Sequence, residues 1–243
     1  AETITTYSVK NIPAEGITAN INNAPSQNLL AGQIDIAGDK IWLCFCSASG
    51  YPIGQAHTFS IGYLDLSDTG PDYDYHAVVS DYPIAYFGVD LETFRVYPDA
   101  DLIIVAGTFQ DLGTNYGRTV LFNISSGALY KSYRYSETYP SCPRRGLRGP
   151  IYYDGRLYGG VTYESGYGQA DYRGMCIVDL ATDSFIYSRP GYASIDNYGF
   201  VHFTVDQANG KLYASSDLNE NGGTSVYEIA SGLWTLYNND SIP

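Results

Sequence analysis

Apolar and polar residues alternate in short segments along most of this chain, which is the period of strands that bury one face. The segments are separated by Gly, Asn, Asp and Ser, the residues that favour tight turns. The longest uninterrupted apolar run, "LIIVAG" from Leu102, has about six residues, far below the ~20 that a membrane-spanning helix needs. The pattern therefore predicts an all-β chain without membrane insertion.

One strand motif occurs four times. It reads "GDKIWLCFC", "DADLIIVAG", "DGRLYGGVT" and "NGKLYASSD", centred on Ile41, Leu102, Leu157 and Leu212. A second motif follows each copy and places one polar residue ahead of a turn of small residues, at Asp65, Asn123, Asp179 and Glu228. We expect these polar residues to bind backbone N–H groups of the turns that follow them. A repeat of 55 to 61 residues indicates one supersecondary unit used four times.

Each repeat contains four short strands, because a strand carrying an aligned glycine precedes the first motif and an alternating strand follows the second. The aligned glycines are Gly32, Gly88, Gly149 and Gly199. The repeats resemble those of β-propellers, particularly the quinoprotein type, in which "DGKLY" precedes an apolar strand with Asp before its turn. The resemblance implies a small β-propeller of four four-stranded antiparallel blades, and it implies no activity.

The predicted domains are an N-terminal arm and linker over residues 1–28 and a propeller over 29–243. The predicted blades cover approximately 29–82, 83–140, 146–190 and 197–240. Two arrangements stay open. In the first, which we favour, the four repeats close a ring within one chain. In the second, they are part of a larger ring that another chain completes.

The arm contains "TITTYSVKN", which alternates like a strand, followed by a linker-like segment. The last repeat already has four strands. The arm therefore either adds an outer strand to its own ring or is donated to a blade edge of a neighbouring molecule. Donation makes a head-to-tail contact, which builds filaments if it does not close. We therefore predict self-association through residues 1–28.

Charge and composition limit which partners and which compartment fit this chain. The net charge is −13. This charge excludes nucleic acid as a binding partner and disfavours binding to anionic membrane surfaces. The chain has 25 Tyr and few charged residues, and it starts with polar residues as a mature secreted chain does. We therefore expect an extracellular protein, with glycosylation sequons at Asn123 and Asn239.

The segment "DLNENGGTSVYE" matches the consensus of an EF-hand calcium loop. It lies between predicted strands, whereas an EF-hand loop lies between helices, so an EF-hand is rejected. Asp217, Asn219 and Asn221 still offer the oxygen ligands that Ca²⁺ takes. The alternative, which we favour, is a plain Asn-Gly turn. No other cofactor is predicted.

The resemblance also implies a ligand site at the mouth of the central channel. Beside the aligned glycines lie Phe87, Asp90, Arg148 and Tyr198. This aromatic, acidic and basic mixture suits a glycan or another small polar ligand, although the same side chains would also serve to fill the channel mouth.

Among the cysteines, Cys142 and Cys176 both belong near the third repeat, and we expect a disulfide between them. Cys44 and Cys46 belong to the first repeat, on the opposite side of a four-bladed ring and out of disulfide range of the other two.

No motif of nucleophilic, phosphate-binding or zinc chemistry is present. The favoured function is thus a secreted, non-catalytic binding or assembly module, including a fibre subunit that uses strand addition. The alternatives are a carbohydrate-binding module and a carbohydrate-active hydrolase or lyase. For an enzyme, Asp35 and Asp90 on the inner strands would be the first candidate carboxylates.

Overall fold

The computed structural model describes ten segments of the chain. They are residues 8–10, 29–47, 57–67, 72–84, 90–111, 114–134, 145–162, 174–188, 202–215 and 224–237. Within these segments the structure consists of strands, turns and one short 3-10 helix, η1 (Pro98–Ala100). No helix in this part of the chain is long and apolar enough to cross a membrane.

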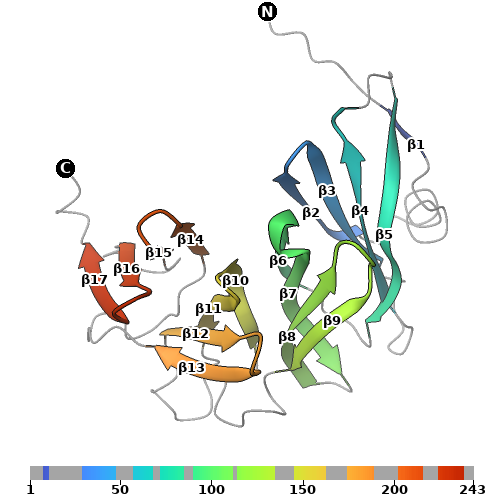
Figure 1. Ribbon diagram of the computed structural model, residues 1–243. Coiled ribbons are helices and arrows are strands. Elements are labelled where there is room, and N and C mark those ends of the chain that lie inside the picture. The colour runs from blue at the N-terminus through green and yellow to red at the C-terminus, as the bar shows by residue number, and fades with distance from the viewer. Residues whose placement is uncertain are drawn as a thin grey trace, which may run out of the picture. The chain divides into compact units, whose positions relative to one another are not determined.

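The strands form four successive antiparallel meanders (Figure 1). The first contains β2 (Leu29–Ala37), β3 (Lys40–Ser47), β4 (His57–Asp65) and β5 (Asp72–Ile84), and the second β6 (Asp90–Tyr97), β7 (Leu102–Asp111), β8 (Thr114–Asn123) and β9 (Leu129–Arg134). The third contains β10 (Arg145–Tyr153), β11 (Arg156–Thr162), β12 (Gly174–Asp179) and β13 (Ser184–Ser188), and the fourth β14 (His202–Asp206), β15 (Lys211–Ser215), β16 (Thr224–Glu228) and β17 (Leu233–Tyr237). These sheets are the four blades of a small β-propeller, as the sequence predicted.

The chain divides into two compact units, each with its own core. In the first unit, one face of the first blade packs on the second blade. The buried cluster there includes Trp42, Cys44, Ile61, Phe94 and Phe122. In the second unit, the third blade packs on the fourth, and the buried cluster includes Tyr158, Met175, Phe203, Leu212 and Tyr227. Successive residues of a strand point to opposite faces, so the alternating pattern supplies apolar faces for this packing.

One backbone hydrogen bond recurs in every blade and joins its two turns at the same end. The N–H groups of Leu66, Ile124, Leu180 and Ile229 donate to the carbonyl oxygens of Asp39, Asp101, Gly155 and Gly210, at 2.7, 3.3, 3.0 and 3.0 Å. This bond aligns Asp101 with Asp39, so Ile103 is the counterpart of Ile41. The sequence alignment, which used Leu102, was wrong by one residue, because the apolar run already begins at Leu102, the position that Lys40, Arg156 and Lys211 occupy in the other blades.

Two of the aligned glycines lie at irregular points of the inner strands. The pairing of β2 with β3 shifts between Leu29 and Gly32, and that of β10 with β11 shifts between Arg148 and Ile151. Gly149, inside the second shift, has a φ of 53°, a conformation that favours glycine. Gly88 and Gly199 lie outside the described residues.

The arm contributes strand β1 (Ser8–Lys10), which pairs in parallel with the outer edge of β5. Ser8 is in register with Asp72, Val9 with Tyr73 and Lys10 with Asp74. The first sheet therefore has five strands in the order β1-β5-β4-β3-β2. The sequence left two positions open for the arm. In the structure, the arm lies on the first blade of its own chain.

Candidate functional site

Most residues predicted to form a site lie outside the described segments. They are Phe87, Tyr198, Asp217, Asn219, Asn221, Cys142 and Asn239. Asp90 is the first residue of β6, and Arg148 stands opposite Gly160 where β10 pairs with β11. The ligand site at the channel mouth and the calcium site therefore remain predictions.

The other two predicted positions are described in part. Cys176 is buried on β12, and its disulfide with Cys142 remains a prediction. Asn123 ends β8, and its side-chain amide donates to the carbonyl oxygen of Asp101 at 3.4 Å and to Asp101 Oδ2 at 3.2 Å. A glycan on Asn123 would replace one hydrogen of this amide, so glycosylation there would compete with these bonds.

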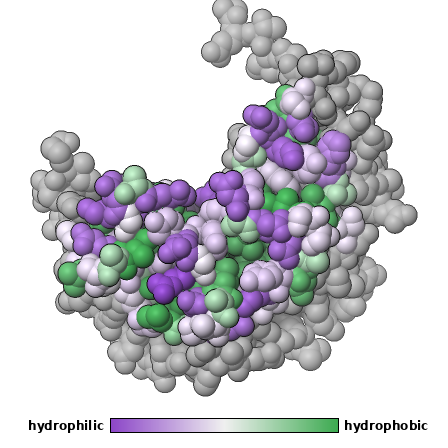
Figure 2. Space-filling view, viewed as in Figure 1, coloured by the Kyte–Doolittle hydropathy of each residue, from purple (hydrophilic) through white to green (hydrophobic). Residues whose placement is uncertain are grey.

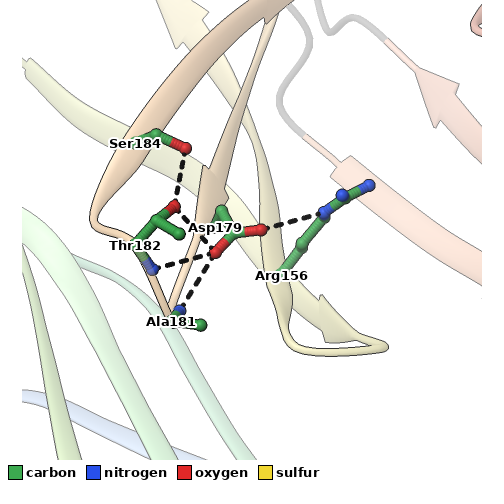
Figure 3. Close-up of polar contacts among 5 residues, drawn as sticks. All are labelled: Arg156, Asp179, Ala181, Thr182 and Ser184. Carbon is green, nitrogen blue, oxygen red and sulfur yellow. Dashed lines mark hydrogen bonds and ion pairs between the residues drawn. The ribbon is translucent and has the colours of Figure 1, made fainter.

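A polar cluster with several hydrogen bonds lies at the turn between β12 and β13 (Figure 3). Asp179 Oδ1 accepts from the backbone N–H of Ala181 at 3.1 Å, and from the N–H and hydroxyl of Thr182, both at 3.0 Å. Its Oδ2 is 3.5 Å from Nε of Arg156, the first residue of β11. Thr182 Oγ1 also lies 2.9 Å from Ser184 Oγ. Asp179 thus holds the turn and joins it to the neighbouring strand.

Carboxylates hold the equivalent turns of the other blades. Asp65 Oδ1 accepts from the N–H and the hydroxyl of Ser67, at 2.9 and 2.6 Å. Glu228 Oε2 accepts from the Ser231 hydroxyl at 3.1 Å. The prediction that these polar residues bind backbone N–H groups of the turns after them is confirmed at Asp65 and Asp179. Glu228 binds its turn through a hydroxyl instead.

In the second blade this role passes to Asp101, which sequence reasoning missed. The N–H and hydroxyl of Ser125 each donate to the Asp101 carboxylate at 2.7 Å, while Asn123 donates to Asp101 as well. Asp206 was also missed, although it holds its own turn by accepting from the N–H and side-chain amide of Asn209 at 3.1 and 2.7 Å. The Asp-x-x-Asn spacing ahead of Gly210 was an available signal for Asp206.

These hydrogen bonds lower the pKa of the turn carboxyls. For Asp179 the main cause is the bonds from Thr182, for Asp65 and Asp101 those from Ser67 and Ser125, and for Asp206 those from Asn209. A glycoside-cleaving pair needs one carboxyl that stays protonated near neutral pH, with a raised pKa. The pKa values of the turn carboxyls are lowered instead, so these groups do not fit the role of that protonated acid, and each binds its own turn.

The pKa shift of Asp179 predicts how stability depends on pH. Folding lowers this pKa below its ordinary value of 3.8. The Asp179 carboxylate therefore adds its full contribution to the free energy of unfolding above that pH, and this contribution is lost as the pH falls through the folded-state pKa. We expect Asp179→Asn to destabilise the protein at pH 7. The difference in free energy of unfolding between this variant and the wild type should become smaller at about pH 2.5. Urea unfolding at both pH values measures this.

Asp154→Asn, in the turn between β10 and β11, is the matched charge control, because it removes the same charge from another turn of the third blade. An equal gap for Asp179→Asn at both pH values would show that its charge does not stabilise the turn.

Strands β9, β13 and β17 each lie at the edge of their sheet, and no described strand pairs with their outer side. These strands also expose large apolar side chains. The exposed fractions are 46% and 45% for Leu129 and Tyr130 on β9, 51% and 38% for Ile186 and Tyr187 on β13, and 65% for Leu233 on β17. On the face in Figure 2, hydrophobic and hydrophilic residues are interspersed and form no single large patch. Of the seven large apolar residues that are exposed in the described segments, five lie on these three strands, and Leu66 and Tyr213 lie elsewhere.

The described segments contain no group of three or more His, Cys, Asp or Glu residues placed to hold a metal ion.

No family model and no curated protein matches this chain. Among solved structures, a hypothetical selenium-binding protein from Sulfolobus tokodaii is similar at 11% identity and a TM-score of 0.48, over 76% of this chain and 44% of that one. A putative TolB from Agrobacterium tumefaciens is similar at 12% and 0.48, over 81% and 61%. A family 117 glycoside hydrolase of Zobellia galactanivorans is similar at 11% and 0.48, over 88% and 70%. The chain thus spans less than two thirds of the first two proteins.

Proposed function

We propose that this chain is an extracellular, non-catalytic β-propeller that acts as a binding and assembly module through the outer edges of its blades. The observation that carries the proposal is the pairing of β1 with the outer edge of β5. It supports the idea that an outer blade edge accepts an added strand, in parallel and without a hairpin connection.

The physical basis is strand addition. An edge strand presents unpaired N–H and C=O groups, so an added strand gains affinity from main-chain hydrogen bonds and specificity from the side chains beside them. Next to the edges of β9 and β13 lie two exposed apolar side chains each, Leu129 with Tyr130 and Ile186 with Tyr187. Covering such side chains adds about 25 cal/mol per Å² of apolar area removed from water.

Two further observations support a non-catalytic, extracellular role. The turn carboxyls have lowered pKa values and bind their own turns, and the sequence carries no catalytic motif. Many Tyr, few charged residues and two sequons are typical of secreted chains.

Carbohydrate binding is the second candidate. Tyr130, Tyr187 and Tyr213 each expose more than a third of their surface, and aromatic rings offer apolar faces with a polar tip to a glycan. Glycan-array binding that is lost in Tyr187→Ala and kept in Tyr187→Phe would favour this candidate over assembly.

The proposal predicts that mass in solution depends on the arm. Light scattering should find the full chain in concentration-dependent oligomers and the chain lacking residues 1–28 as a monomer, because removal of the arm removes the donated strand. Negative-stain images of the full chain would show whether the contacts close or form fibres. A full chain that is monomeric at every concentration would overturn assembly.

A further inference from the structure

We propose that β1 is exchanged between molecules, so that Ser8–Lys10 of one copy occupies the β5 edge of a second copy in the register that the structure shows. This inference rests on the proposed function and names its partner and its site. The partner is another copy of this chain, and the site is the edge formed by Asp72, Tyr73 and Asp74.

The first argument is the position of β1 in the sheet. Among the described residues, strand β1 has one neighbour, β5, and pairs with it over Ser8–Lys10. The bonds of this pairing are the same whether β1 belongs to the same chain or to another, which is the condition for exchanging an identical element between molecules. Exchange therefore loses no contact of the β1–β5 pair.

The second argument is the length of the connection. Strands β1 and β2 lie on opposite edges of a five-stranded sheet, about 19 Å apart across four strand spacings. The connection consists of residues 11–28, whose fully extended length is roughly 60 Å. This length is about three times the minimum, so the covalent chain does not restrict β1 to the β5 edge of its own molecule.

The third argument concerns the strength of the contact. Pro13 follows Lys10 by three residues in the sequence and has no N–H to donate to a sheet. Lys10, the cationic residue of β1, is in register with Asp74, although the net charge of −13 makes whole molecules repel each other. Repulsion between like-charged molecules predicts a reversible contact that strengthens with salt, because salt screens the repulsion.

Two chains with one new cysteine each test the exchange. Val9→Cys is placed in one chain and Tyr73→Cys in another carrying a mass tag, and the two are mixed and treated with a short bis-thiol crosslinker. Val9 and Tyr73 are in register, and in this mixture they meet only if β1 crosses between molecules. We expect a crosslinked heterodimer on a non-reducing gel, in a yield that falls when excess wild-type chain is added.

Controls separate this inference from the proposed function. Each variant mixed with wild-type chain measures the background from the native cysteines, and a chain carrying both substitutions reports pairing within one molecule. If the double variant crosslinks only as a monomer and the mixture gives no heterodimer, exchange at β5 is wrong. The proposed function then still stands if removal of residues 1–28 dissociates oligomers, and it fails too if no oligomer forms.

Discussion

Replacing Gly127 with alanine is expected to destabilise the protein by about 3 kcal/mol or more. Gly127 lies in the turn between β8 and β9 with a φ of +65°, and a Cβ added there would lie 2.0 Å from the carbonyl oxygen of Val78 on β5. The obstructing atom belongs to the backbone of a strand, so it cannot move aside as a flexible side chain would. The turn of the second blade must then withdraw from the first blade, and equilibrium unfolding in urea measures the loss.

Gly155→Ala is the matched control. Gly155 also has a left-handed backbone, with a φ of +75°, but an added Cβ there meets nothing within 4 Å among the described residues. Its cost should be that of the backbone conformation alone, about 1 kcal/mol. If the two variants lose equal stability, the close approach of the Gly127 turn to β5 is wrong.

Replacing Trp42 with alanine is expected to destabilise the protein by about 3–5 kcal/mol, the usual cost of removing a buried aromatic side chain. Trp42 is 1% exposed and lies in the cluster between the first two blades, where its ring packs at 5.0 Å from that of Tyr63. Its loss leaves a cavity lined by side chains from both blades, including Ile61 and Phe122. Thermal and urea unfolding would both record the change.

Trp42→Phe separates the packing of this residue from its polarity. The indole N–H of Trp42 is buried and has no hydrogen-bond partner among the described residues, and a buried donor without a partner costs about 1–3 kcal/mol. Phenylalanine keeps most of the ring packing and removes that donor, so it should lose less than half the stability that alanine loses. Equal losses for the two variants would show that the indole N–H has a partner.

The blade architecture was predictable because it depends on local pattern. Alternating strands and turn residues recur at nearly constant spacing, and each blade is built from neighbours in sequence. The register of the second blade was not predictable in the same way, since the apolar pattern, "LIIVAG", begins one position early and looks the same when shifted by one residue. Only the hydrogen bond from Ile124 to Asp101 fixes that register.

The turn carboxylates illustrate the same difference. Asp65 and Asp179 bind N–H groups two or three residues ahead, so a sequence pattern finds them. Asp101 binds Ser125, which is 24 residues away, so its role follows only from the pairing of β7 with β8. The channel-mouth residues Phe87 and Tyr198 lie outside the described segments, and their role remains a prediction.

The central claim is that the arm joins molecules by strand pairing, and sedimentation velocity on two full-length variants tests it most directly. Successive N–H groups of a strand point to opposite edges, so one of the two prolines in Val9→Pro/Lys10→Pro must remove a donor that faces β5. Val9→Ala/Lys10→Ala changes the same side chains and keeps both N–H groups. We predict concentration-dependent oligomers for the alanine variant and a monomer for the proline variant. Identical sedimentation of the two variants would contradict the claim.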